Sequence, residues 1–316
     1  MSLVVAESSA RFPGNYLTKI PGPVVVTGAS GFVGRRLVEA LQRKEYETIS
    51  VDLTSSAAGQ DATDILSDRL ADSIPHSSQI VHLAAISSDK DCARDPLAAI
   101  KINIEGTANL LKAAVSVGSK QVIFASSEWV YGDYRGVTPL TEETEIGLNR
   151  LTSLYARSKF FAETLFTDYL ATNSQILRFG IVYGARLQGG CALEAVATNC
   201  LEGDTVTIGS KKNGRRFIHV DDLVAALLCS LERPMKTGIF NLGGPEMITL
   251  ENIIKGMSVL LDKQILVTEK SPDDWVQRNV ISKRFYEEFE FEPVWSLEDG
   301  LKAIIRASRQ NSSASE

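Results

Sequence analysis

Short apolar runs alternate along most of the chain with longer segments whose apolar residues recur at helical spacing. The apolar runs cover residues 24–26, 47–52, 79–85, 121–127, 175–182 and 238–242. The clearest helical patterns cover residues 96–118 and 151–169. Strands that alternate with helices indicate a parallel sheet covered by helices on both faces. We therefore predict an α/β fold with a doubly wound parallel sheet of the Rossmann type.

The alternation loosens after residue 184, which indicates a second unit beside the sheet. We expect residues 23–184 and 213–245 to form the nucleotide-binding Rossmann domain. Residues 185–212 and 246–316 then form a smaller, C-terminal, substrate-binding lobe. Residues 1–22 have no basic region followed by a long apolar stretch, so we expect a poorly structured leader.

Composition and charge exclude several classes of function. The chain has 316 residues, is 44% hydrophobic and carries a formal net charge of −6 without a basic run, so we expect no nucleic-acid partner. No apolar run is long enough to span a membrane. The four cysteines are scattered and the three histidines lack metal-ligand spacing, which predicts reduced thiols, a cytoplasmic protein and no metal site.

A glycine-rich turn follows the first apolar run, with Gly28, Gly31 and Gly34 in the spacing G-x-x-G-x-x-G. Glycine permits backbone conformations closed to other residues and lets a helix lie close on a strand. The free amides of the first helical turn then bind an anion such as a phosphate. Three glycines alone are also typical of an ordinary tight turn between a strand and a helix.

The second apolar run ends in Asp52, 18 residues after Gly34. In a β-α-β nucleotide fold an acidic residue at this place accepts hydrogen bonds from the adenosine ribose and repels a 2′-phosphate. Asp52 therefore favours NAD over NADP. The alternative interpretation is an ordinary exposed aspartate at the end of a strand.

Tyr155 and Lys159 lie four residues apart, which places them on one face of the predicted helix 151–169. A lysine ammonium near a phenol favours the phenolate and lowers its pKa. Tyr155 is therefore a candidate acid/base, and Ser127, at the end of the neighbouring strand, is a candidate second hydrogen-bonding group for the same substrate oxygen. An exposed Tyr–Lys pair is the alternative when this pattern stands alone.

Taken together, the motifs resemble the extended short-chain dehydrogenases/reductases of the NAD-dependent epimerase/dehydratase family. The resemblance covers about residues 23–305. It rests on T-G-A-S-G-F-V-G at 27–34, D-I at 64–65, H-L-A-A at 82–85, S-S-x-x-V-Y-G at 126–132, Y-x-x-x-K at 155–159, V-Y-G at 182–184 and R-R-F-I-H-V-D-D at 215–222.

The resemblance implies roles for individual residues. Ser127, Tyr155 and Lys159 would be catalytic. The cofactor-binding residues would be Gly28, Ser30, Gly31, Phe32, Val33, Gly34, Asp52, Asp64, Ile65, Leu83, Ala84, Ala85, Tyr155, Lys159, Phe179 and Ile181. Within this set, Asp64 would contact the adenine amino group and Ile65 the adenine ring. The substrate-binding residues would be Ser87, Ser127, Glu128 and Arg215.

Two further expectations concern charged residues late in the chain. Arg215 matches an arginine that binds the substrate diphosphate in many relatives; a solvated loop arginine is the equal alternative. We expect His219, Asp221 and Asp222 to form a capped turn into the next helix. Asp221 or Asp222 is then a candidate partner for Arg178.

Two positions depart from the family pattern. Relatives that dehydrate or decarboxylate commonly have a glutamate two residues after the catalytic Ser/Thr, where this chain has Trp129 and has Glu128 one residue earlier. This weakens a dehydratase interpretation. Trp129 is either a core residue or a residue that stacks on a sugar ring. Nucleotide-sugar epimerases often have asparagine where this chain has Ile181, which argues against a standard UDP-hexose.

We therefore predict a cytoplasmic, NAD-dependent nucleotide-sugar epimerase that acts through a transient keto intermediate. The alternatives are a nucleotide-sugar 4,6-dehydratase, an NAD(P)-dependent reductase or dehydrogenase of a sugar or small carbonyl compound, and a non-catalytic nucleotide-binding regulator. The resemblance also implies a homodimer that pairs through the helices 96–118 and 151–169.

Overall fold

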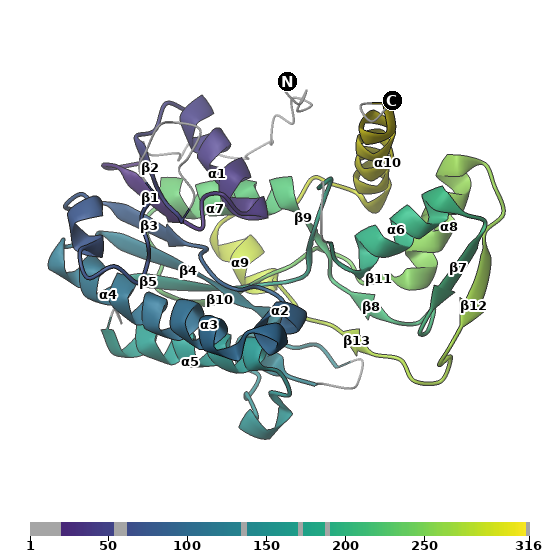
Figure 1. The fold of residues 1–316 in the computed structure, drawn as a ribbon, viewed down its shortest axis with the longest axis horizontal. Helices are drawn as coiled ribbons and strands as arrows, with labels where there is room; N and C mark the ends of the chain where they lie inside the picture. The colour runs from purple at the N-terminus through teal and green to yellow at the C-terminus, as the bar shows by residue number, and fades with distance from the viewer. Residues whose placement is uncertain (1–19, 54–61, 134–137, 170–172, 187–189, 314–316) are drawn as a thin grey trace.

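The computed structural model describes residues 20–53, 62–133, 138–169, 173–186 and 190–313. Its centre is a sheet of six parallel strands in the order β10-β5-β4-β3-β1-β2 (Figure 1). The strands are β1 (Val24–Thr27), β2 (Thr48–Val51), β3 (Gln79–His82), β4 (Gln121–Ser127), β5 (Ser174–Phe179) and β10 (Gly238–Leu242). The predicted parallel α/β sheet is confirmed. The strand order reverses beside β1, and ligands of open α/β sheets bind at such a reversal.

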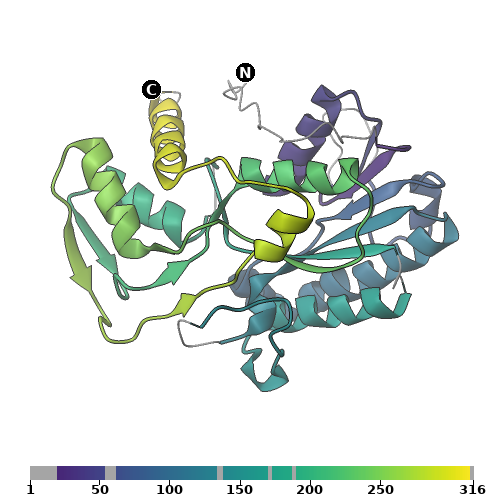
Figure 2. The same ribbon diagram turned by 180° about the vertical axis from the view of Figure 1, so that it is seen from behind.

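Helices cover both faces of this sheet (Figures 1 and 2). One face carries α1 (Phe32–Arg43) and α7 (Val220–Glu232), and the other carries α4 (Thr107–Ser116) and α5 (Leu154–Tyr169). Apolar side chains fill the space on each side, with Leu37, Leu223 and Phe240 in one core and Leu110 and Phe166 in the other. Because both faces are covered, most strands contain consecutive apolar residues instead of an alternating pattern, which explains the hydrophobic runs in the sequence.

The predicted helix 96–118 is one continuous helical segment with a change of pitch in the middle. It consists of α3 (Pro96–Ile100), a π-helical stretch η2 (Lys101–Gly106) and then α4. The side chain of Asp95 caps its start by accepting a hydrogen bond from the amide of Ala98 at 3.0 Å. Such π-helical stretches occur frequently at functional sites.

A smaller body lies beside the sheet and has its own core (Figure 2). Its helices are α6 (Ala192–Glu202), α8 (Leu250–Leu261) and α10 (Leu297–Ser313). Strand β7 (Thr205–Ile208) pairs with β12 (Leu266–Glu269), and β8 (Gly214–Arg215) lies between β11 (Ile248–Thr249) and β13 (Gln277–Arg278). Strand β6 (Val182–Tyr183) pairs with β9 (Ile218–His219) where the two bodies meet.

The remaining short elements are η1 (Leu70–Ser73), α2 (Asp89–Arg94), η3 (Glu128–Tyr131), η4 (Leu148–Arg150) and α9 (Lys283–Glu288). Helix α9 packs on β10, and its Phe285 belongs to the core of the large sheet. The division into two lobes stays a proposal, since α9 lies late in the chain but contacts the larger body. Most of the predicted leader, residues 1–19, lies outside the described residues, whereas Ile20 is buried in the core.

The expected pairing of Arg178 with Asp221 or Asp222 is wrong. Arg178 makes a two-pronged ion pair with Glu163 on α5, at 3.0 Å from Nε and 2.8 Å from Nη2. The two aspartates lie in the first turn of α7, which covers the opposite face of the sheet. Asp221 pairs with Arg36, and Asp222 accepts the backbone amides of residues 294 and 295. The capped turn is confirmed, because the His219 side chain accepts the amide hydrogen bond of Asp221.

Candidate active site

The glycine-rich turn after β1 is a tightly packed cradle. Gly28 has a φ of +68°, and a Cβ there would lie 2.7 Å from the amide nitrogen of Ala84 at the end of β3. A Cβ on Gly34 would lie 2.1 Å from the carbonyl oxygen of Gly28, so only glycine lets α1 approach the turn this closely. Gly31 is the N-cap of α1. The first turn of this helix has neither a side-chain cap nor an acidic residue. The helix therefore offers free amides to an anion.

Asp52 lies directly beside this cradle. Its carboxylate accepts a hydrogen bond from the backbone amide of Ser30 at 3.0 Å. Strand β2 thus brings an acidic side chain to the turn that follows β1, as the sequence spacing predicts. The carboxylate gives this edge of the cradle a negative charge, which disfavours an additional phosphate there.

Asp64 and Ile65 lie in the turn before η1 and have different surroundings. Asp64 is exposed and accepts the backbone amide of Leu66 at 2.9 Å. Ile65 is buried in the core and contacts the helix near Gly106. Ile65 therefore anchors this turn to the core, while Asp64 leaves part of its carboxylate accessible to a ligand.

Leu83, Ala84 and Ala85 follow β3 and border the glycine cradle. All three are half-buried, and the amide of Ala84 donates to the Thr27 hydroxyl at 3.2 Å. Small side chains after β3 leave space at the carboxyl ends of the strands, where this fold binds ligands. Ser87, a predicted substrate-binding residue, is exposed just before α2.

Ser127, Tyr155 and Lys159 come together at the carboxyl end of β4. The Ser127 hydroxyl lies close enough to the phenol of Tyr155 to act on its pKa. Lys159 lies one helical turn further along α5 and donates to the carbonyl oxygen of Ala125 at 2.8 Å. All three side chains are buried. The strand and the helix therefore hold the predicted catalytic groups side by side.

The expected lowering of the Tyr155 pKa is wrong for the protein as it stands. Burial raises the pKa of Tyr155 to about 12, the Ser127 hydrogen bond acts against this, and nearby Asp89 and Glu128 raise it further. Burial also lowers the pKa of Lys159 to about 8. Residue spacing predicts that the two side chains lie on one face of the helix, but it contains no information about how completely the fold removes water from them.

Asn103, a buried residue that the sequence analysis did not identify, connects the segments around Tyr155 by hydrogen bonds. Asn103, in the π-helical stretch, donates to the Ile86 carbonyl at 3.1 Å and accepts the Ile86 amide at 2.8 Å. Its amide also donates to the hydroxyl of Ser158 at 3.0 Å, and Ser158 donates to the carbonyl oxygen of Tyr155. Asn103 therefore ties the loop after β3 to the turn of α5 that carries the phenol.

Phe179 is the last residue of β5, Ile181 follows two residues later, and both are half-buried. Phe179 packs against the core of the large sheet, and Ile181 packs against the core of the smaller body. The Ile181 carbonyl accepts the amide of Ile218 at 3.0 Å. These two residues thus lie where the two bodies meet, beyond the carboxyl end of the sheet.

Glu128, directly after Ser127, lies in a cluster of charges. It is fully buried, and its Oε1 atom is 3.4 Å from Nε of Arg215 and 3.4 Å from Nη1 of Arg278. Arg215 is therefore held by a buried carboxylate and is not a solvated loop residue. Arg278, which no sequence pattern singled out, also stacks on the half-buried ring of Trp129 at 4.6 Å. The Trp129 ring also packs against a small hydrophobic cluster of Cys92, Ala99 and Tyr155.

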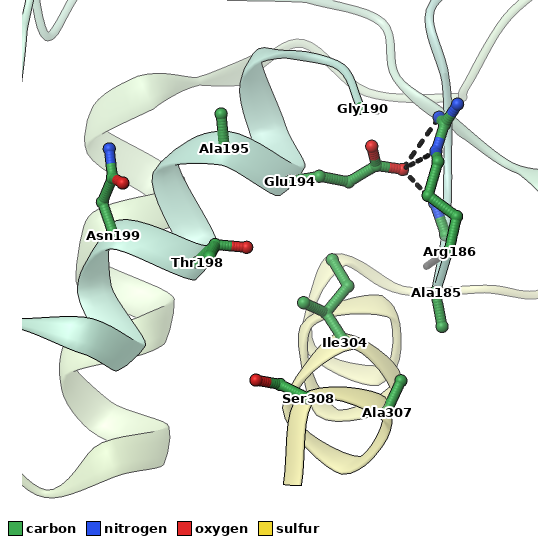
Figure 3. Close-up of a pocket in the computed structure, with 11 residues that line it drawn as sticks. Ala185, Arg186, Gly190, Glu194, Ala195, Thr198, Asn199, Ile304, Ala307 and Ser308 are labelled. Atoms are coloured by element: carbon green, nitrogen blue, oxygen red, sulfur yellow. Dashed lines mark hydrogen bonds and ion pairs between the residues drawn. The ribbon is translucent and has the colours of Figure 1, made fainter. Parts of the chain in front are cut away.

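A separate pocket of about 350 Å³ opens between α6 and α10 (Figure 3). Figure 3 shows Arg186 and Glu194 facing each other at one side of it, joined by an ion pair of 2.9 Å. None of the predicted site residues lines this pocket. Among the residues that the structure describes, no three His, Cys, Asp or Glu side chains form a possible metal site, and no helix could cross a membrane.

The family model described as "NAD dependent epimerase/dehydratase family" matches residues 24–243. UDP-glucuronic acid decarboxylase 2 of Arabidopsis thaliana is 31% identical over 310 residues, which are 91% of this chain and 68% of that protein. The solved structure of MoeE5 in complex with UDP-glucuronic acid and NAD is 26% identical and superposes with a TM-score of 0.80 over 92% of this chain and 100% of that chain.

A UDP-glucuronic acid 4-epimerase from Bacillus cereus, solved with UDP-glucuronic acid and NAD, is 25% identical, with a TM-score of 0.79 over 92% of this chain and 99% of that chain. NAD fits the residues present here, because the uncapped start of α1 and the glycine cradle leave room for phosphates and Asp52 stands beside them. The chain belongs to the NAD-dependent epimerase/dehydratase family, within the extended short-chain dehydrogenases/reductases.

Proposed function

We propose that the protein epimerises a nucleotide-activated sugar through a transient keto intermediate, with Tyr155 as the acid/base. The neighbouring, buried side chains of Ser127 and Tyr155 at the end of β4 carry this proposal. Two hydroxyl groups in this position can both contact one substrate oxygen. The solved relatives with UDP-sugars and NAD support a UDP-linked substrate.

The residues divide the proton chemistry between them. Tyr155 accepts the proton of a sugar hydroxyl while the C–H hydrogen leaves that carbon as hydride, and Ser127 donates a hydrogen bond to the same oxygen. NAD, when bound, would supply the hydride acceptor and donor, and epimerisation requires that the hydride return to the opposite face of the carbon. Tyr155 then gives the proton back to the oxygen. Tyr155 accepts the proton as the phenolate, and Lys159, one helical turn further along α5, is the proposed source of a positive charge that favours this form against the effect of burial.

The proposed NAD-binding residues extend from the glycine cradle along the carboxyl ends of the strands. We propose that the amides at the start of α1 hold the NAD diphosphate and that Asp52 holds the adenosine ribose. Asp64 and Ile65 then flank the adenine, and residues 83–85 line the cleft toward the nicotinamide. Phe179 and Ile181 lie near its reactive end.

One observation favours a second candidate function, decarboxylation of a UDP-linked uronic acid. Glu128 follows Ser127 directly and lies between two arginines. A carboxyl group beside the oxidised sugar provides a second acid for protonating the carbon that loses carbon dioxide. The plant relatives named as decarboxylases support this candidate.

We also propose a homodimer that forms through α3 and α5. Leu97 and Ile100 on α3 and Phe161 on α5 are large apolar side chains that are exposed in the protomer. Pairing of these helices about a two-fold axis would bury them. Mass measurement by light scattering at micromolar concentration tests this, and a single-protomer mass contradicts it.

Incubation with UDP-, GDP-, dTDP- and CDP-sugars without added cofactor tests the proposed reaction. Proton NMR and mass spectrometry are read together. A new sugar signal at unchanged mass supports epimerisation with retained NAD, and loss of carbon dioxide from a uronate supports the second candidate. Loss of water, or turnover only with stoichiometric NAD(H) or NADP(H), contradicts both. Tyr155→Phe with undiminished turnover contradicts the acid/base assignment.

A further inference from the structure

Asp89 is the first residue of α2, a short helix that packs against α5. Cys92, three residues later, is fully buried and belongs to the same small hydrophobic cluster as Tyr155. Residues three apart on a helix share one side of it, so the Asp89 side chain lies on the side of α2 that faces Tyr155. A carboxylate on a loop-borne helix therefore stands beside the proposed acid/base.

The Asp89 carboxylate has an oxygen without a hydrogen-bond donor. Its side chain is half-buried, and within the described residues its Oδ1 atom is closed to solvent and has no partner. Asp91, the other aspartate of α2, is paired, because the Ser88 hydroxyl donates to it at 2.6 Å and Arg94 lies 2.9 Å from it. An ionised carboxylate can only accept hydrogen bonds, so Asp89 requires a donor that a ligand can supply.

The groups around Tyr155 differ in their availability to a ligand. Three titratable groups contribute to the raised pKa of Tyr155, namely Cys92 and Asp89 from α2 and Glu128 from η3. Burial raises the pKa of Cys92, so its thiol stays protonated at neutral pH. Glu128 is fully buried between two arginines. Among these three groups, Asp89 is therefore the charged one that a ligand can reach.

The backbone on both sides of Asp89 is fixed by hydrogen bonds. Asn103 holds Ile86 through two contacts of 2.8 and 3.1 Å. The Cys92 thiol donates to the Ile86 carbonyl at 3.4 Å, and the Ser88 side chain caps the first turn of α2. A fixed acceptor loses little conformational freedom when a ligand binds, so its contact with the ligand retains more of its free energy.

We propose that Asp89 is a substrate-binding residue that accepts a hydrogen bond from a hydroxyl group of the sugar, in addition to the oxygen that contacts Ser127 and Tyr155. This inference rests on the proposed function, and it assigns to the site a sugar with a second free hydroxyl group. A hydroxyl that donates to an ionised carboxylate forms a stronger hydrogen bond than one that donates to a neutral acceptor. Since the site is partly closed to water, solvent screens this contact weakly.

Binding of UDP and of UDP-glucose is measured by calorimetry on the NAD-loaded full chain, with Tyr155→Phe in every protein to prevent turnover. The readout is the Kd for UDP divided by the Kd for UDP-glucose, which removes changes that affect the nucleotide alone. We expect this ratio to fall about 10- to 100-fold in D89A, because a hydrogen bond to a charged group is lost. D89N keeps a neutral acceptor of the same shape, so its ratio should fall by about 3- to 10-fold.

Four analogues of UDP-glucose, each without the hydroxyl at carbon 2, 3, 4 or 6 of the sugar, identify the group that Asp89 contacts. One analogue should bind the parent about 10- to 100-fold more weakly than UDP-glucose does. The same analogue should bind the parent and D89A within about twofold of each other, because its contact with Asp89 is already absent. The other three should lose affinity in D89A as UDP-glucose does.

Asp91→Asn is the matched control, because Asp91 lies on the same helix but its carboxylate is 44% exposed and paired with Arg94. Its ratio should equal that of the parent. A D89A ratio within about twofold of the parent, an equal fall in D91N, or the same loss for all four analogues overturns the inference and leaves the proposed function intact. Failure of UDP and UDP-glucose to bind the parent overturns the proposed substrate class and this inference with it.

Discussion

The ammonium group of Lys159 donates a hydrogen bond to the carbonyl oxygen of Ala125 at 2.8 Å, which ties helix α5 to the end of strand β4. The same ammonium lies 4.9 Å from the centre of the Phe124 ring. A lysine in this position is held by one carbonyl oxygen and a ring in a region without water. Burial of this charge therefore has a cost in stability, since it lowers the pKa of Lys159 to about 8 from 10.5.

We expect Lys159→Met to lose turnover but to resist urea better than the parent at pH 7.5. In the parent, the unfolded chain holds the lysine proton up to pH 10.5 and the folded chain only up to about pH 8. The free energy of unfolding of the parent therefore rises with pH between these values, by up to about 3 kcal/mol. The advantage of the variant should shrink by about 2 kcal/mol between pH 7.5 and pH 9.5.

Urea unfolding of both proteins at the two pH values checks this prediction. Lys283→Met serves as the control, because this side chain is 73% exposed and its removal should give the same difference at both pH values. An advantage of Lys159→Met that is constant with pH would show that the lysine is not destabilised by burial.

Removal of one partner of the buried Arg178–Glu163 pair should be strongly destabilising. Arg178→Met leaves the Glu163 carboxylate with the Ser126 hydroxyl but without a positive charge, and we expect a loss of about 3–5 kcal/mol. The double variant R178M/E163L removes both charges and should recover part of this loss. Chemical denaturation measures all three proteins, and a loss below about 1 kcal/mol in Arg178→Met contradicts the prediction.

Gly34→Ala should separate α1 from the turn after β1. Its Cβ would lie 2.1 Å from the Gly28 carbonyl oxygen, so the helix must move, at a cost of about 1–3 kcal/mol. We expect less NAD to remain with the purified variant, measured by absorbance and by release after denaturation. Gly203→Ala is the control, since the nearest atoms to its Cβ would be 4.0 Å away. Unchanged NAD content in Gly34→Ala would refute the phosphate assignment of the cradle.

Asp52→Asn should weaken the preference for NAD over NADP. The asparagine keeps the size of the side chain beside Ser30 but removes the negative charge that opposes a 2′-phosphate. We expect the ratio of the two Kd values to change by about tenfold in favour of NADP. Fluorescence titration with NADH and NADPH measures it. Asp72→Asn, an exposed residue paired with Arg69, should leave the ratio unchanged.

The parts of the site that depend on local spacing could be predicted from the sequence. The cradle of Gly28, Gly31 and Gly34 depends on a single strand-turn-helix pattern, and the placement of Tyr155 and Lys159 on one helix depends on a single helix pattern. The partners of Arg178 and Arg215 could not be predicted in this way. Each partner lies on an element that only the packing of the whole chain brings close.

Residue spacing also could not predict the electrostatic environment. The raised pKa of Tyr155 follows from burial by residues of α2 and of the loop after β3, which no local pattern records. Arg278 lies in the two-residue strand β13, and only its register beside Arg215 brings it close to Glu128. The role of Asn103 could not be predicted either, because its hydrogen-bond partners are 17 and 55 residues away in the sequence.

The π-helical turn at Lys101–Gly106 makes this segment sensitive to length as well as to residue identity. Each residue of an α-helix turns the chain by about 100°, so a turn that contains one extra residue fixes the rotation of everything after it. Deletion of one residue there would leave an ordinary α-helix, but it would rotate Thr107 away from His82, which it now contacts at 2.9 Å. In this segment, a one-residue deletion would therefore be more damaging than most substitutions.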